Sequence, residues 1–211
     1  FRRGDTFNTG TSFVATGGSV TIGAYGSGAQ PIIVRTTETE TAIKISSTKV
    51  NDLRIMDLEI KGATSSPADK GACISVSANV TNILLLRTRC HDIGKGVIMT
   101  GANGITGSVI QDSLIYNINA ASGGVGIYGQ ATLSAYMGNH VGPFGTAAEH
   151  NIRCQPCRLV DISNNTITTP GTSGKTLLTI RAAEHLKDAG SYKNPDSQYI
   201  HIGDNKLIGT A

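Results

Sequence analysis

The chain has 211 residues and a mass of 21.9 kDa, with 26 glycines, no tryptophan and only 16% charged residues. This length suits one core or one solenoid, and the turn-rich, β-leaning composition is too apolar for a disordered chain. The net charge of +3 is mild, which excludes a basic nucleic-acid-binding arm but permits an anionic partner. We find no transmembrane run or signal peptide, and a start at Phe1 without Met predicts a processed form or fragment of a longer chain.

The first predicted elements fall within residues 1–34. A strand over residues 19–22, a glycine-rich turn and a buried strand after Pro31 would form the opening coil or its cap, together with residues 1–14. This order of strand, Tyr25-Gly26, glycine and Pro31 resembles the opening turn of many secreted right-handed β-helix proteins. The resemblance implies a fold and no particular activity.

A short pattern then repeats along the chain: an apolar residue, two further residues, a small or amide residue, one residue, and another apolar residue. Its six copies begin at Ile55, Leu85, Ile110, Tyr136, Ile162 and Ile202. Each copy follows an alternating segment, and these segments start at Ala42, Cys73, Val97, Val125, Asn151 and Leu178. Period-2 alternation predicts half-buried strands, and no convincing amphipathic helix is present.

One turn of about 25 residues with two or three strands is the size of a coil in a parallel β-helix. Asn139, Asn165 and Asn205 share the small-or-amide position, where stacked asparagines can form a ladder. Thr88 and Ser113 hold that position in earlier coils, so the ladder would be partial. A β-sandwich is the alternative, but it gives no reason for a fixed corner amide. We therefore predict an all-β protein: one right-handed parallel β-helix over residues 1–211.

The four cysteines admit several interpretations. Cys154 and Cys157 form a CxxC that could be half of a metal site or a redox pair, although no second CxxC and no βαβ pattern accompany it. Cys73, Cys90 and Cys154 alternate with apolar residues, which favours small core side chains. A secreted location would permit disulfides, but the spacing fixes no pairing.

Two Ile-Arg pairs, Ile152-Arg153 and Ile180-Arg181, occupy what we interpret as equivalent places in successive coils. With coils about 4.8 Å apart, Tyr128, Arg153 and Arg181 would form a strip on one outer face. Two stacked cations require an acidic neighbour or an anionic ligand. Glu149 and Glu184 could neutralise them in a purely structural cluster. The functional alternative is recognition of carboxylates in an acidic polysaccharide.

A polar insertion between Arg181 and Tyr199 lengthens the last repeat and could project beside this strip. Cleavage of a uronate polymer by β-elimination would need cations to neutralise the carboxylate, a base and an acid. The predicted catalytic residues are Arg153, Arg181, Tyr128, His150, Lys175 and His185. The predicted substrate contacts are Asn151, Arg158, Lys187 and Tyr192.

Glu149-x-x-x-Arg153, followed by Leu178-Thr-Ile-Arg181, resembles segments of the alginate lyase and chondroitinase B group of β-helix lyases. In that group a Lys acts as base, an Arg as acid, and a Glu helps to hold calcium. The resemblance implies the acid role for Arg181 and a calcium-binding role for Glu149. Arg153 stands one residue early where the group has Lys, and Arg181 is followed by Ala-Ala-Glu-His rather than His-Gly.

Two other functions remain open. A hydrolase would need two converging carboxylates, for which Glu149 and Glu184 are the candidates. A structural or adhesive β-helix, such as a fibre, surface-layer or phage tail module, would use the arginines as scaffold and could self-associate through its coil ends. We favour a secreted or cell-surface protein that binds, and could cleave, an acidic polysaccharide, with no nucleic-acid partner and no membrane span.

Overall fold

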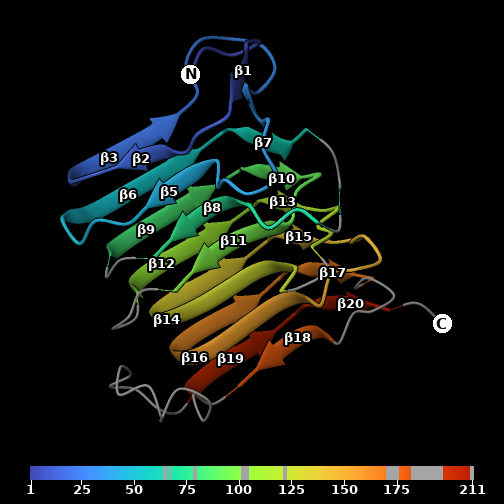
Figure 1. The fold of residues 1–211 in the computed structure, drawn as a ribbon. Helices are drawn as coiled ribbons and strands as arrows, with labels where there is room; N and C mark the ends of the chain where they lie inside the picture. Colours follow the sequence, from blue (N-terminus) through green and yellow to red (C-terminus); the bar gives the residue numbers. More distant parts are fainter. Residues whose placement is uncertain are drawn as a thin grey trace.

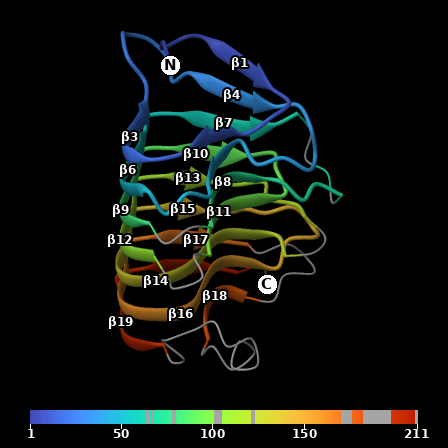
Figure 2. The ribbon, with the colours of Figure 1, turned by 60° about the vertical axis from the view of Figure 1, so that its left-hand side comes forward.

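The computed structural model describes residues 1–63, 66, 68–77, 80–100, 105–120, 123–169, 176–181 and 197–209. Within these ranges the chain is all-β and forms a parallel β-solenoid of about six turns, stacked from the N-terminal coil to the C-terminal coil (Figure 1). A second view shows the strands of successive coils lying one above another (Figure 2). None of the described residues forms a helix of the length and apolar character needed to cross a membrane.

One wall, which we call the β7 face, is an eight-stranded sheet whose strands follow one another along the solenoid. In spatial order it contains β1 (Thr6–Thr9), β4 (Ile32–Arg35), β7 (Glu59–Gly62), β10 (Arg89–His91), β13 (Leu114–Ile115), β15 (His140–Val141), β17 (Thr166–Thr168) and β20 (Lys206–Ile208).

The other strands belong to a larger sheet that wraps around two further walls. The β11 face contains β2 (Phe13–Ala15), β5 (Ile43–Ile45), β8 (Ala72–Val76), β11 (Lys95–Met99) and β18 (Thr176–Ile180). The β12 face contains β3 (Gly18–Gly23), β6 (Val50–Met56), β9 (Thr81–Leu86), β12 (Ile105–Gln111) and β19 (Gln198–Gly203). The long strands β14 (Val125–Met137) and β16 (His150–Ser163) run through both walls, and their pairing shifts register between Gly129 and Ala131.

The predicted repeat is confirmed coil by coil. The first residues of all six units lie in one register and are aligned across the β12 face in the order Ile55, Leu85, Ile110, Tyr136, Ile162 and Ile202. The apolar residues that end the units, from Ile60 to Leu207, are aligned in the same way on the β7 face. Side chains that alternate inward from the three walls fill one continuous core, in which Ile55, Leu85 and Ile110 are fully buried.

The predicted asparagine ladder is also confirmed. Asn139 Nδ2 donates to Asn165 Oδ1 (3.0 Å), and Asn165 Nδ2 donates to Asn205 Oδ1 (2.9 Å). Each acceptor oxygen also receives the main-chain N–H of the rung before it, so the same amide holds the corner of the neighbouring coil. Thr88 and Ser113 continue the contact with their hydroxyls, 3.1 Å apart. The ladder therefore fixes the register of the last coils.

Replacing Asn165 by alanine is expected to lower the free energy of unfolding by about 1–3 kcal/mol, because the Asn139 amide and the Tyr136 carbonyl would lose buried partners. Denaturant unfolding monitored by circular dichroism measures the change. His140→Ala is the control, because His140 is exposed on strand β15. This change should alter the free energy of unfolding by less than about 0.5 kcal/mol. Equal stability of the two variants would contradict the ladder's role.

Cys73, Cys90 and Cys154 lie in the core as predicted, and all four cysteines are paired in disulfides, whose partners the sequence spacing left open. One disulfide joins Cys73 of β8 to Cys90 of β10, and the other joins Cys154 to Cys157 within β16. All four residues are almost fully buried. The CxxC thiols are therefore bonded to each other and face the core, so neither is available as half of a metal site. Sequence spacing could not reveal the first pair, because its partners meet only when the coil closes.

The N-terminal coil forms as expected from residues 1–34 and ends in an aromatic cluster. Phe1 packs edge-on against Phe7 and Phe13, with ring centroids 4.8 and 5.5 Å apart. The terminal amine donates to the Gly23 carbonyl at 2.7 Å. These contacts pack Phe1 against the first coil and the adjoining core.

Candidate functional site

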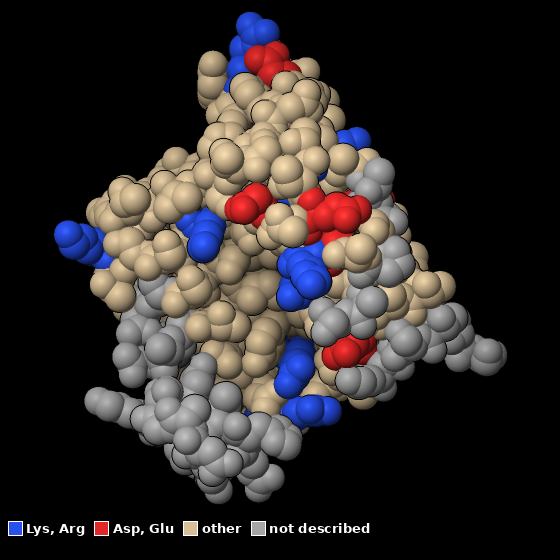
Figure 3. Space-filling view, viewed as in Figure 1, with Lys and Arg blue, Asp and Glu red and all other residues tan. Residues whose placement is uncertain are grey.

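A pocket of about 220 Å³ opens on the β11 face, where the strands of three successive coils begin. It is lined by Lys95, Ile98, Gly123, Gly124, Val125, Tyr128, Glu149, His150 and Arg153. Four of these residues, Tyr128, Glu149, His150 and Arg153, were predicted from the sequence. In the space-filling view, Lys and Arg side chains follow one another down the stacked coils beside a hollowed surface, with acidic side chains near them (Figure 3).

Tyr128 and Arg153 form the best-defined contact of the pocket. They are paired across β14 and β16, and Arg153 Cζ lies 5.1 Å from the centre of the Tyr128 ring. Arg153 Nε and Nη2 donate to Gln155 Oε1 at 3.0 and 2.5 Å, and Gln130 Nε2 donates to the Tyr128 hydroxyl at 3.2 Å. Two glutamines therefore hold the guanidinium and the phenol in a cation–π stack, so both groups are oriented before any ligand binds.

His150 and Glu149 form the wall of the pocket next to this stack. His150 is only 2% exposed, and its Nδ1 is within hydrogen-bonding distance of the hydroxyls of Thr176 (2.8 Å) and Thr179 (3.3 Å). These contacts fix the ring of His150, which is one of the residues that line the pocket. The Glu149 main-chain N–H donates to the Gly124 carbonyl at 2.8 Å, which ties the two coils together at the pocket mouth.

Lys95 is a pocket residue that the sequence analysis missed. The predicted strand began at Val97, whereas β11 begins at Lys95, which pairs with Ala72. Because Val97 pairs with Ile127, Lys95 lies level with Val125 at the pocket edge. The coil register gives this position once the strand start is known. Lys95 and Arg153 bring two cations to a small pocket whose lining includes one carboxylate, that of Glu149.

The predicted stacking of Arg153 on Arg181 is wrong. Arg153 pairs with Thr179, and Ile180 pairs with Cys154. Arg181 follows Ile180, so it lies level with Gln155, two residues further along the chain than the prediction required, and its side chain is exposed. A slip of two residues preserves the alternation of inward and outward side chains, so the sequence pattern could not distinguish the two registers.

The remaining predicted residues are dispersed. Asn151 is fully buried and its amide donates to the carbonyls of Val141 (2.9 Å) and Thr168 (2.8 Å), so it holds a turn and does not face the pocket. Arg158 is exposed on the β12 face, where it pairs with Thr132 and Gln198. Residues 170–175 and 182–196, which include most of the insertion, lie outside the described residues, and with them Lys175, Glu184, His185, Lys187 and Tyr192.

The described residues contain no group of three His, Cys, Asp or Glu side chains arranged to hold a metal ion. Glu149 is the one carboxylate on the pocket lining, whereas calcium sites combine several oxygen ligands. The calcium-binding role that the family resemblance implied for Glu149 therefore gains no support from the described part of the chain.

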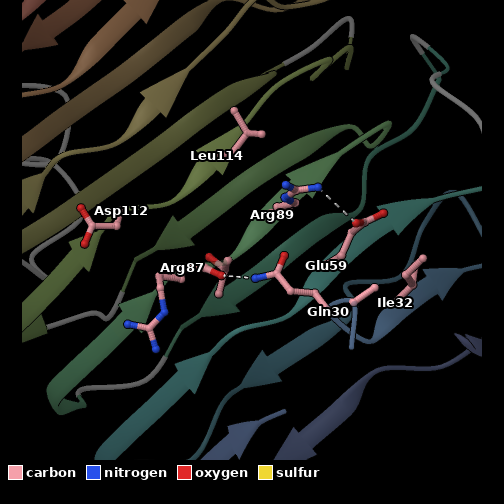
Figure 4. Close-up of a pocket in the computed structure, with 9 residues that line it drawn as sticks. Gln30, Ile32, Glu59, Arg87, Arg89, Asp112 and Leu114 are labelled. Atoms are coloured by element: carbon pink, nitrogen blue, oxygen red, sulfur yellow. Dashed lines mark hydrogen bonds and ion pairs between the residues drawn. The ribbon is translucent and has the colours of Figure 1, made fainter. Parts of the chain in front are cut away.

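A larger hollow of about 500 Å³ lies on the β7 face, near the corner that carries the ladder (Figure 4). Gln30 Nε2 donates to the Arg87 carbonyl at 2.8 Å, and Arg89 lies 3.9 Å from Glu59. The Arg87 guanidinium makes two bonds to Asp57, at 2.7 and 2.8 Å. Arg87 thereby holds the pKa of the Asp57 carboxyl below its usual range. The two cations that line this hollow, Arg87 and Arg89, are thus already paired with carboxylates of the neighbouring coil.

On the same strand as Arg89, His91 bridges two carboxylates. Its Nε2 lies 3.3 Å from Glu59 Oε1 and its Nδ1 lies 2.8 Å from Asp92 Oδ2. The ring stacks on Tyr116, with centroids 4.5 Å apart. Burial, followed by the charges of Glu59 and Asp92, raises the pKa of the Tyr116 phenol. The cluster is internally satisfied, so the pocket on the β11 face is the better candidate for binding an anion.

No protein-family model matches the sequence, and comparison with curated proteins gives no match. Solved structures similar to this chain include a rhamnogalacturonan lyase, with 14% identity and a TM-score of 0.48 over 99% of this chain and 55% of that one. They also include a GH136 lacto-N-biosidase from Eubacterium ramulus, with 13% identity and a TM-score of 0.46 over 98% of this chain and 53% of that one. The chain thus spans about half the length of these structures.

Proposed function

We propose that this chain is an extracellular carbohydrate-binding β-solenoid whose pocket on the β11 face takes a uronate residue of an acidic polysaccharide. The observation that carries the proposal is the Arg153–Tyr128 stack, 5.1 Å from guanidinium carbon to ring centre, in a pocket that Lys95 also lines. A planar guanidinium suits a carboxylate in two-point contact, and an aromatic ring suits the apolar face of a sugar.

The size and position of the pocket fit this ligand class. Its volume of about 220 Å³ lies below the range of drug-sized cavities and fits a single sugar unit better than a large ligand. The pocket opens on an outer wall of stacked strands, so a polymer could continue across neighbouring coils. The two cations are closer to the solvent than the buried His150, which favours binding of an anion at the mouth.

Cleavage by β-elimination is the reaction that these residues would support. Lys95 and Arg153 would neutralise the uronate carboxylate and so acidify the neighbouring C–H. The Tyr128 hydroxyl or the His150 ring would remove that proton, and the other would protonate the departing glycosidic oxygen. Among the described residues, Glu149 is the single carboxylate on the pocket lining, and Glu184, the other carboxylate predicted for a hydrolytic pair, lies outside them.

The extracellular location rests on the two disulfides. All four cysteines are bonded within the chain, and structural disulfides form and persist in oxidising compartments.

The test is titration of the protein with alginate, polygalacturonate and glycosaminoglycan oligosaccharides by calorimetry, alongside a neutral glucan. We expect binding of at least one uronate oligosaccharide, weakening as salt screens the two cations, and no binding of the glucan. Ultraviolet absorbance of unsaturated products then separates a lyase from a protein that only binds. If the protein binds none of the uronate oligosaccharides, the proposal is wrong and the scaffold alternative is favoured.

A further inference from the structure

The outer surface of the β12 face carries a ridge of three large apolar side chains, Leu133, Leu159 and Tyr199. They occupy the same place in successive coils and are 56%, 44% and 71% exposed. Each has a positive φ, near 54°. Earlier coils have Asn82 and Gly107 at this place, which are residue types that tolerate left-handed backbone. In the last three coils, large apolar residues therefore occupy a strained backbone conformation and are exposed to solvent. This combination points to a surface that another molecule covers.

Beside the ridge lies an open groove of about 430 Å³. Val109, Ala135, Asp161 and His201 line it, and they belong to an outward column of the β12 face that follows the strand register through the earlier coils as well. From the N-terminal coil onward this column contains Thr21, Arg54, Leu84, Val109, Ala135, Asp161 and His201. A cation near one end, apolar residues in the middle and an anion near the other end make an ordered series.

This series is complementary to itself when it is reversed about Val109. Arg54 then faces Asp161, Leu84 faces Ala135, and Val109 faces its own counterpart. Opposite charges meet, and a large side chain meets a small one. Because parallel coils are spaced evenly, at about 4.8 Å, all of these pairs can form at once.

The ridge obeys the same reversal. Its place in the earlier coils is held by Ser19, Asp52 and Asn82, with Gly107 at the centre. Reversal sets Tyr199 against Ser19 and Leu133 against Asn82, so tall side chains face short ones. In the next outward column the same reversal sets Leu86 against Met137 about Gln111, which brings two apolar side chains together.

We propose that the β12 face is a dimer interface with a second copy of this chain. The two solenoids pack face to face with their axes antiparallel, related by a two-fold axis that runs along β12. Such an interface is isologous, so each complementary pair occurs twice. Aligned packing of two sheets at about 10 Å lets the ridge of one copy fill the space above the short residues of the other.

The charged pair makes the arrangement testable. Arg54 lies 3.2 Å from Asp52 and Asp161 lies 2.9 Å from His201 within one chain. Both are partly exposed, at 54% and 40%, so they can turn toward the other copy.

Light scattering and analytical ultracentrifugation over a concentration series should show a dimer. Arg54→Asp alone or Asp161→Arg alone should raise the dimer Kd at least about tenfold, because like charges then face each other. The double variant restores opposite charges and should return the Kd close to that of the unmodified chain. A protein that is monomeric at every concentration, or a double variant no better than the singles, would overturn the proposal.

A second variant separates the interface from folding. Leu159→Asn places at the ridge the residue type found at Asn82, so it should relieve strain and raise the Tm of the dilute monomer by about 2–4 °C. The same change should weaken the dimer, since the smaller asparagine fills less of the space above Asp52 of the second copy. A Leu159→Asn protein that dimerises as tightly as the unmodified chain would contradict the role of the ridge.

Discussion

Replacing Asp69 by alanine is expected to lower the free energy of unfolding by about 3–5 kcal/mol, the largest effect on stability that we predict for one side chain. Arg35 and Asp69 are 2% and 0% exposed, and Arg35 Nη2 donates to Asp69 Oδ2. Asp69 Oδ1 also accepts the Gly71 main-chain N–H at 2.8 Å. Without the carboxylate, the Arg35 guanidinium would remain buried with no counter-charge. Denaturant unfolding of the two proteins measures the loss.

The reason lies in desolvation. Burial raises the pKa of the Asp69 carboxyl, although Arg35 and the Gly71 amide oppose that shift. Removing both charges from water therefore costs about as much as their attraction returns, and the pair as a whole adds little to stability. Breaking one half is what costs free energy.

Two control proteins distinguish this explanation from a general loss of packing. The double variant Arg35→Met with Asp69→Asn removes both charges and keeps an acceptor for the Gly71 amide, so it should recover much of the stability. Asp52→Ala breaks a pair whose partners are 35% and 54% exposed, and it should cost less than about 1 kcal/mol. A double variant as unstable as Asp69→Ala would show that the buried charge is not the cause.

The coil repeat could be predicted because each coil repeats one requirement: an apolar residue must face inward at each wall. That requirement recurs at Ile110, Tyr136 and Ile162, and a shift by one residue would expose all of them. The ladder followed from the same spacing, since an amide at a shared inner corner can bond the next coil on both sides. The pairing of residues in successive coils could thus be predicted from a short repeated sequence pattern.

The candidate site was less predictable, because the wrong predictions about its residues are consistent with the same inward–outward pattern. The predicted register set Arg153 beside Arg181, and the observed one sets Arg153 beside Thr179. The two registers differ by two residues and give the same alternation of inward and outward side chains, so the sequence pattern could not distinguish them. Lys95 precedes the alternating residues, and nothing in the pattern marks the start of its strand. The disulfide partners Cys73 and Cys90 belong to different walls, and their contact depends on how the coil turns between them.

Replacing Arg153 by alanine is expected to weaken binding of a uronate oligosaccharide by about 10–100-fold, the largest effect on function that we predict. The guanidinium offers two parallel donors to a carboxylate, and its stack on Tyr128 keeps it oriented. Arg153→Lys keeps the charge but loses the planar fork, so it should recover only part of the affinity. Calorimetric titration at two salt concentrations measures all three proteins, and the unmodified chain should show the steepest loss of affinity with salt.

Arg158→Ala is the matched control, because Arg158 belongs to the same strand, β16, but lies on the β12 face, outside the pocket. Its removal subtracts the same charge from the chain, so any decrease in affinity that comes only from net charge should appear equally in both variants. We expect Arg158→Ala to bind within about twofold of the unmodified chain, since an exposed charge remote from the ligand is screened by salt. If Arg153→Ala and Arg158→Ala weaken binding equally, the ligand is attracted by overall charge and the pocket has no specific role.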